Sequence, residues 1–149
     1  MGGRELGYRG AQYLHARLQR GGIGVVKSVP ADATRGRPWI GVWPEGFSVE
    51  RYREAAERIL SGNFRLFGND LALGFPPDWN CDPSTGTQAP LVFGKTLNYR
   101  DAAVVGNIKY LWEANRHLEL VTLAQAWRLT GEARFADGCR TLVDSWIRQ

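Results

Sequence analysis

The sequence predicts a mainly helical protein with long irregular loops. Two long segments in the C-terminal half have apolar residues at helical spacing, and a glycine separates them. A shorter amphipathic segment begins at Ser48, directly after a stretch that is dense in proline and glycine. We therefore divide the chain into residues 1–47, an N-terminal helix with an irregular Pro/Gly-rich segment, and residues 48–149, a helical region.

The N-terminal part is expected to contain one helix. This helix covers residues 7–20 and ends at Gly21, where glycine provides the usual helix stop. Residues 22–47 are expected to be irregular, with a short run from Trp39 to Trp43 that could be extended. Two tryptophans in such a segment indicate packing onto a neighbouring surface.

The second helix has clear start and stop signals. Ser48 is a good N-cap residue, and Phe47 with Tyr52 occupies the two positions of a hydrophobic staple. Gly62 ends the helix. The following residues, 63–107, have few helix signals and are expected to be irregular, which in a compact domain usually indicates a functional or packing segment.

The strongest helical pattern covers residues 108–130, and its apolar residues lie around the whole circumference. Such a helix is normally buried, so we expect other helices, most of them outside this sequence, to enclose the segment around Trp112. Because buried charge needs a partner, the spacing pairs Arg116 with Glu113 or Glu119.

A last amphipathic helix is expected from Ala133 to the end of the chain, forming an αα-hairpin across Gly131. Its apolar stripe continues almost to the last residue without a capping signal. This pattern suggests a chain that is the N-terminal piece of a larger protein.

Composition restricts the possible functions. The chain has 149 residues, 44% hydrophobic residues and a net charge of +4. No apolar run approaches the roughly 20 residues that a membrane-spanning helix needs, and no signal peptide is visible. The mild excess of basic residues is most simply explained by an ordinary solvated surface, and next by attraction to a polyanion. Nucleic-acid binding comes last, because no recognition motif accompanies the charge.

The two cysteines, Cys81 and Cys139, lie far apart in the sequence and without a Cys/His cluster. We therefore expect two free thiols and no metal site. No cofactor is expected either.

Four sequence blocks, in this order, resemble the N-terminal region of bacterial heparinase II/III-family proteins. They are a loop at 76–86 that contains Trp-Asn-Cys-Asp-Pro-Ser-Thr-Gly, a segment at 107–117 that contains Ile-Lys-Tyr-Leu-Trp-Glu-Ala-Asn-Arg, a Leu-Ala-Gln-Ala-Trp-Arg-Leu-Thr-Gly hairpin at 123–131, and Ser-Trp-Ile at 145–147. The resemblance covers roughly residues 50–149. The sequence departs mildly at Asn107, where the family often has an acidic residue, and at Trp127, which replaces a tyrosine.

The resemblance implies an incomplete α/α toroid, normally followed by the rest of the toroid and a C-terminal β-rich domain. It also implies β-elimination of uronate-containing acidic polysaccharides and a location in the bacterial periplasm or cell envelope. The family uses Asn, His and Tyr as catalytic groups, but these lie beyond the matched region. No catalytic residue is therefore assigned to this chain, which we expect to be inactive alone.

The candidate substrate-binding residues are Trp79, Asn115, Arg116 and His117. An aromatic face can stack on a sugar ring, an amide can neutralise a carboxylate, a guanidinium matches a carboxylate or sulfate, and an imidazole can act as a base. The alternative for each is structural, with Trp79 filling the core beside a turn that Asp82 caps. Consecutive residues on a helix point about 100° apart, so 115–117 cannot all face one substrate.

Three functions therefore remain open: a piece of a polysaccharide lyase, a module that binds acidic glycans without cleaving them, and a structural or nucleic-acid-binding helical domain. The last has only the basic charge in its favour, and we expect no nucleic-acid partner.

Overall fold

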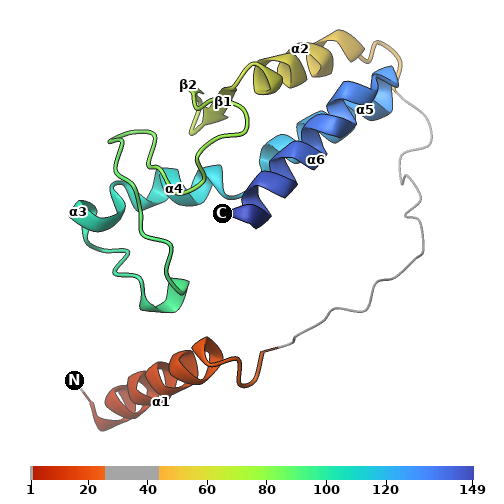
Figure 1. Ribbon diagram of the computed structural model, residues 1–149. Coiled ribbons are helices and arrows are strands. Elements are labelled where there is room, and N and C mark those ends of the chain that lie inside the picture. Colours follow the sequence, from red (N-terminus) through yellow and green to blue (C-terminus); the bar gives the residue numbers. More distant parts are fainter. Residues whose placement is uncertain (1, 26–43) are drawn as a thin grey trace. The chain divides into compact units, whose positions relative to one another are not determined.

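A computed structural model describes residues 2–25 and 44–149 (Figure 1). The protein is mainly helical, as predicted, and the described part adds one small antiparallel sheet of two strands. The predicted extended run from Trp39 to Trp43 lies outside the described residues.

The chain forms two compact units. One comprises Met1–Trp43 together with Val92–Leu97, and the other comprises Pro44–Leu91 together with Asn98–Gln149. The predicted division after residue 47 falls just inside the second unit. The short segment at 92–97, which belongs to the first unit, was not separated from the C-terminal region in the sequence.

In the first unit, helix α1 (Gly3–Arg20) begins earlier than the sequence predicts and ends at Gly21 as expected. Its only buried residue is Ala16. The short 3-10 helix η1 (Gly94–Thr96) belongs to the same unit, and the Lys95 ammonium there donates a hydrogen bond to Gln19.

Helix α2 (Val49–Leu60) opens the second unit, and the predicted staple is confirmed. Ser48 is its N-cap residue, although the Ser48 side chain makes no capping hydrogen bond. The rings of Phe47 and Tyr52 stack with centroids 5.1 Å apart. They fix the direction in which the chain enters the helix.

A β-hairpin follows α2, so the prediction that residues 63–107 are irregular is wrong at its start. Strands β1 (Asn63–Leu66) and β2 (Asn69–Ala72) pair antiparallel through a two-residue turn at Phe67 and Gly68, both with positive φ. Phe64 and Leu66 alternate into the core. The strands were missed because they are only four residues long and because the turn lacks the usual Asn-Gly signal.

The hairpin is closed at its base by a contact between two glycine backbones. The Gly62 carbonyl accepts hydrogen bonds from the N–H groups of Leu73 and Gly74. A Cβ on Gly62, whose φ is 82°, would lie 2.8 Å from the Cα of Gly74. Glycine is therefore required here for both conformation and space.

The predicted helix over 108–130 is two helices, α4 (Ile108–Ala114) and α5 (Leu118–Thr130). His117 adopts the left-handed conformation, with φ 56°, and the helical hydrogen-bond ladder cannot continue through it. A short helix, α3 (Ala102–Val105), precedes α4 and is capped by the Asp101 side chain.

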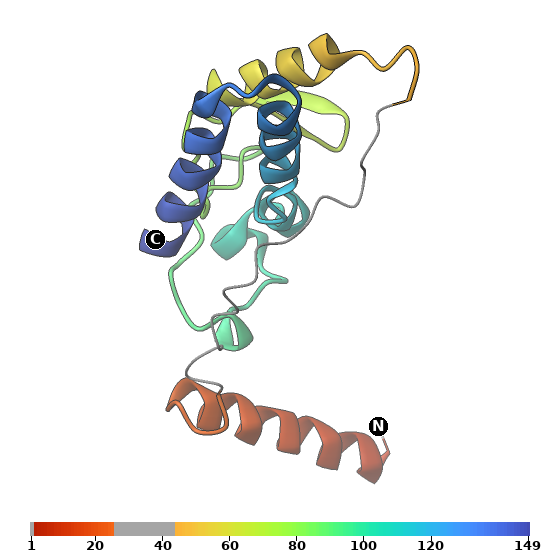
Figure 2. The same ribbon diagram turned by 90° about the vertical axis from the view of Figure 1, so that its right-hand side faces the viewer.

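Helices α5 and α6 (Ala133–Arg148) form the predicted hairpin, turning at Gly131, which is left-handed as a helix stop usually is (Figure 2). Helix α2 packs against both helices. At Gly138 of α6, an added Cβ would lie 2.7 Å from a methyl group of Leu60. The missing side chain therefore permits the close approach of α6 to α2.

The core of the second unit lies between α2, α5 and α6, and the loop after the hairpin reaches into it. The buried residues of this core are Ala56, Ile59, Phe64, Trp79, Leu123, Ala126, Phe135 and Leu142.

The described part of the chain does not enclose α4 and α5 on all sides, and their enclosure by further helices stays a prediction. Trp112 is 56% exposed, and Val121 and Trp127 are also exposed. On α6, Trp146 and Ile147 are exposed as well. We call these five residues the exposed apolar face. Trp112 contacts the Tyr99 ring and Trp146 contacts the His117 ring, but each of the five side chains remains at least partly exposed.

Candidate functional site

The loop at 78–89 is organised around the buried carboxylate of Asp82. Its oxygens accept hydrogen bonds from the Ser84 N–H (2.9 Å), the Ser84 and Thr85 hydroxyls, and the Asn107 N–H (2.6 Å). The Gly86 N–H donates to the Asp82 carbonyl, which closes the predicted turn. Asp82 therefore caps this turn, as the structural alternative proposed, and also holds the start of α4.

The environment of Asp82 favours its charged form. Burial by itself raises the pKa of Asp82, but hydrogen bonds from Thr85, Asn107 and Ser84 outweigh it and lower the pKa below its ordinary value. Gly106 lies directly against this carboxylate, with φ 64° and no room for a Cβ. The loop and the α3–α4 connection are thus locked together.

Trp79, the first predicted sugar contact, is buried with 2% of its surface exposed. Its indole N–H donates to the Ser145 hydroxyl (2.9 Å), and its backbone N–H donates to the Gln149 side chain (3.1 Å). The indole fills the core between the loop and the end of α6. This arrangement fits the structural alternative, and a sugar contact at Trp79 stays a prediction.

Asn115 joins three elements at the end of α4. Its amide NH₂ donates to the Trp79 carbonyl (2.7 Å) and the Leu111 carbonyl (2.9 Å). Its amide oxygen accepts from the Trp146 indole N–H (2.9 Å). All three bonds serve to hold the loop, α4 and α6 together.

His117 lies beside Asn115 and is enclosed by two tryptophans. Its ring centroid is 5.0 Å from that of Trp79 and 5.0 Å from that of Trp146. Both ring nitrogens are buried and lack a hydrogen-bond partner among the described residues. Burial between the two indoles lowers the pKa of His117, which favours the neutral imidazole.

Arg116 is separated from the other three candidates. Its side chain is 64% exposed and pairs with Glu113 at 3.1 Å, one of the two partners that the spacing predicted. The predicted partner Glu119 is instead buried and unpaired on one oxygen. The argument that 115–117 lie on a helix was wrong, because they form the link between α4 and α5.

The structure thus brings Trp79, Asn115 and His117 into one cluster and leaves Arg116 outside it. The cluster packs the loop, α4 and α6 together, and the His117 imidazole within it makes no hydrogen bond among the described residues.

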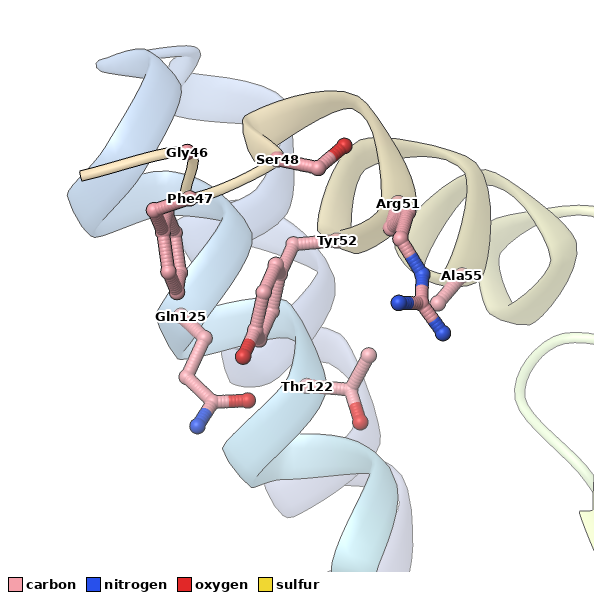
Figure 3. A pocket seen from close by; sticks show the side chains of 8 residues that line it. All are labelled: Gly46, Phe47, Ser48, Arg51, Tyr52, Ala55, Thr122 and Gln125. Carbon is pink, nitrogen blue, oxygen red and sulfur yellow. The ribbon is translucent and has the colours of Figure 1, made fainter. Parts of the chain in front are cut away.

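An open pocket lies elsewhere, between the start of α2 and the middle of α5, and it has about 520 Å³ of free volume. Figure 3 shows the Phe47 and Tyr52 rings side by side above Gln125, with Arg51 and Thr122 on the other side of Tyr52. Arg51 is exposed and makes no ion pair within the described residues.

This pocket combines an aromatic pair, a free guanidinium, an amide and hydroxyl groups. Aromatic rings provide an apolar surface with a polar edge, and a guanidinium binds a carboxylate or sulfate with two parallel hydrogen bonds. Sequence analysis assigned Phe47 and Tyr52 only to a helix staple. It missed the pocket because α5 contributes Thr122 and Gln125 from a distant part of the chain.

Other site chemistries find no support in the described residues. No group of three or more His, Cys, Asp or Glu side chains gathers there in a way that could hold a metal ion. Cys81 and Cys139 are free thiols, as predicted, and burial raises the pKa of each. None of the described helices is both long and apolar enough to cross a membrane.

Comparison with known proteins gives no relative. No protein-family model matches the chain, and neither a curated protein nor a solved structure matches it.

Proposed function

We propose that the chain is the N-terminal toroid portion of a heparinase II/III-like polysaccharide lyase, and that it contributes binding surface rather than catalytic groups. The substrate class is a uronate-containing acidic polysaccharide. The catalytic groups of β-elimination come from the remainder of the toroid, so the chain alone is inactive.

The pocket of Figure 3 carries this proposal. A sugar ring with a carboxylate needs an apolar face, a fixed cation and hydrogen-bonding side chains. Phe47 and Tyr52, Arg51, and Gln125 provide these groups around one opening. The guanidinium has no competing acidic partner among the described residues, so an acidic ligand displaces only water from it.

The exposed apolar face supports the toroid part of the proposal. Helices α4, α5 and α6 expose large apolar side chains that a further layer of helices would bury, the largest being Trp112, Trp127 and Trp146. Large apolar side chains that are exposed on neighbouring helices are common at interfaces. In a toroid of helical hairpins, this face would adjoin the following hairpins.

Retention on immobilised acidic polysaccharide tests the binding part. We expect salt-sensitive retention on a uronate polymer, no retention on neutral dextran, and weaker retention of Arg51→Gln. Arg140→Gln is the matched control, because Arg140 is an exposed arginine on α6 that pairs only with Asp137. Equal retention of both variants, or stronger retention on DNA than on the uronate polymer, would contradict glycan binding in this pocket.

The lyase part needs the full-length protein. We expect it to release unsaturated uronate products, detected by their ultraviolet absorbance, whereas the present chain releases none. Cleavage without an unsaturated product would indicate hydrolysis and would refute β-elimination.

A module that binds acidic glycans without cleaving them is the second candidate. It is favoured by the same pocket, because Arg51 and the aromatic pair need no catalytic neighbour to bind. Retention by the full-length protein with no unsaturated product would identify this second function. Absence of retention would leave a purely structural helical domain.

A further inference from the structure

Glu119 is a buried acid with one carboxylate oxygen that has no hydrogen-bond partner among the described residues. It is the second residue of α5 and is only 7% exposed. Its Oε2 atom is buried and has no hydrogen-bond partner among the described residues. Such a group normally costs stability, so its presence calls for a partner outside the chain.

Glu119 lines a second cavity, which adjoins the pocket of Figure 3 at Ala55 and Thr122. This cavity has a volume of about 200 Å³ and is formed by α2, the β1–β2 hairpin and the start of α5. Its apolar wall includes Ile59, and its polar lining includes Arg58, Arg65, Asp70 and Glu119. A volume of this size suits a single sugar ring rather than a longer segment.

The two arginines of this cavity are also unused. Within the described residues, neither Arg58 nor Arg65 forms an ion pair or a side-chain hydrogen bond. Other arginines near acidic groups of this unit are paired: Arg53 with Glu132 at 3.0 Å, and Arg134 with both Glu57 and Glu132. Two unpaired guanidinium groups, the unpaired Asp70 carboxylate and Glu119 therefore line the same small cavity.

These groups match the chemistry of one sugar acid. Guanidinium groups bind a carboxylate through charge-assisted hydrogen bonds, and a carboxyl group binds vicinal hydroxyls. Burial raises the pKa of Glu119, a backbone hydrogen bond partly opposes this, and the nearby Glu113 charge adds a smaller rise. A simple inorganic anion would engage the arginines but would leave Glu119 unsatisfied.

We propose that the cavity lined by Arg58, Arg65 and Glu119 is a subsite for a single hexuronate ring. The two arginines hold its carboxylate, and Glu119 binds its ring hydroxyls. This inference rests on the proposed function, because an acidic glycan is what presents a hexuronate to the protein.

Titration of the ¹⁵N-labelled chain with D-glucuronate, followed by NMR, tests the subsite. We expect saturable shifts of the backbone amides of Glu119 and Thr122 and of the Arg58 and Arg65 side-chain N–H groups. Glucose, which lacks the carboxylate, and inorganic sulfate, which lacks the hydroxyls, are each expected to bind at least tenfold more weakly, because each loses a charge-assisted or buried hydrogen bond. Sulfate binding as tightly as glucuronate would overturn the assignment to a sugar acid.

Variants sharpen the test. Arg65→Gln and Glu119→Gln are each expected to weaken glucuronate binding roughly tenfold. The matched controls are Arg140→Gln and Glu54→Gln, both at exposed helical positions away from the cavity lining. Equal affinity in the cavity variants and the controls, with native spectra in all four, would refute the subsite.

The outcomes separate this inference from the proposed function. Glucuronate binding at Glu119, together with a full-length protein that neither retains nor cleaves uronate polymers, would sustain the subsite and refute the lyase. Cleavage by the full-length protein with no shift at Glu119 would sustain the lyase and refute the subsite.

Discussion

Two buried carboxylates in the second unit differ in how fully the protein satisfies their hydrogen bonds. Asp82 is fully buried, and its oxygens accept hydrogen bonds from Ser84, Thr85 and Asn107. Glu119 is almost as buried, yet one of its oxygens has no partner within the described residues. The pKa of Asp82 is lowered and that of Glu119 is raised.

The difference separates a structural acid from an available one. An acid that the protein itself satisfies stabilises the fold and has no remaining capacity for a ligand. An acid that is buried and unsatisfied destabilises the fold until a ligand completes it. We therefore expect Asp82 to stabilise the fold and Glu119 to bind a ligand. Each of the following variants tests one of these two roles.

The largest effect is expected for Asp82→Ala. The substitution leaves four donors in the loop and at the start of α4 without this acceptor, so the free energy of unfolding should fall by about 3 kcal/mol. Chemical denaturation measures the change. The control is Asp137→Ala, an exposed acid on α6, which should change stability by less than about 0.5 kcal/mol. Similar losses for both variants would remove the special role of Asp82.

A smaller loss is expected for Gly106→Ala. The new Cβ would lie 2.8 Å from the Cβ of Asp82, and φ at this position is 64°. Strain and overlap together should lower the free energy of unfolding by about 2 kcal/mol. Gly94→Ala is the control, because its added Cβ meets nothing within 4 Å. Full stability of Gly106→Ala, measured by thermal unfolding, would show that the loop is not locked to the α3–α4 connection.

The turn at Asp82 could be predicted from the sequence, whereas the cavity at Glu119 could not. The turn beginning at Asp82 was predicted because its residue types form a local pattern, and local hydrogen bonds follow from local sequence. The staple of Phe47 with Tyr52 and the stop at Gly131 were predicted for the same reason. Each of these features needs only residues within a few positions of one another.

What escaped prediction depends on contacts between distant segments or on a single unusual residue. The left-handed conformation of His117 splits the predicted helix, and histidine carries no signal for it in the sequence. The cavity at Glu119 assembles Arg58 of α2 and Arg65 of β1, and its hairpin was not predicted. Spacing along the helix instead suggested Arg116 as a partner for Glu119, but helix α5 begins after Arg116.

Replacing the available acid should have the opposite sign from replacing the structural one. Glu119→Gln removes the cost of burying a charge, so at neutral pH it should raise the free energy of unfolding by about 1 kcal/mol. Denaturant titration against Glu54→Gln measures the gain. A loss of stability in Glu119→Gln would mean that the protein already satisfies this carboxylate, and the comparison with Asp82 would collapse.

The subtlest effect is the dependence of these differences on pH. The pKa of Asp82 is lowered, so its contribution to stability is present above the ordinary aspartate pKa of about 3.9 and is lost as the pH falls below it. The pKa of Glu119 is raised, so its contribution is present below the ordinary glutamate pKa of about 4.3 and is lost as the pH rises through its higher folded value.

The stability advantage of Glu119→Gln over the wild type should therefore shrink on acidification from neutral pH towards pH 4. The stability deficit of Asp82→Asn should persist over that range and shrink only below it. His117 titrates in all three proteins and cancels from these differences, which denaturant midpoints at a series of pH values measure. Parallel curves for Glu119→Gln and the wild type would mean that Glu119 keeps the same proton affinity in the folded and unfolded chain, and its burial would then have no electrostatic cost for a ligand to relieve.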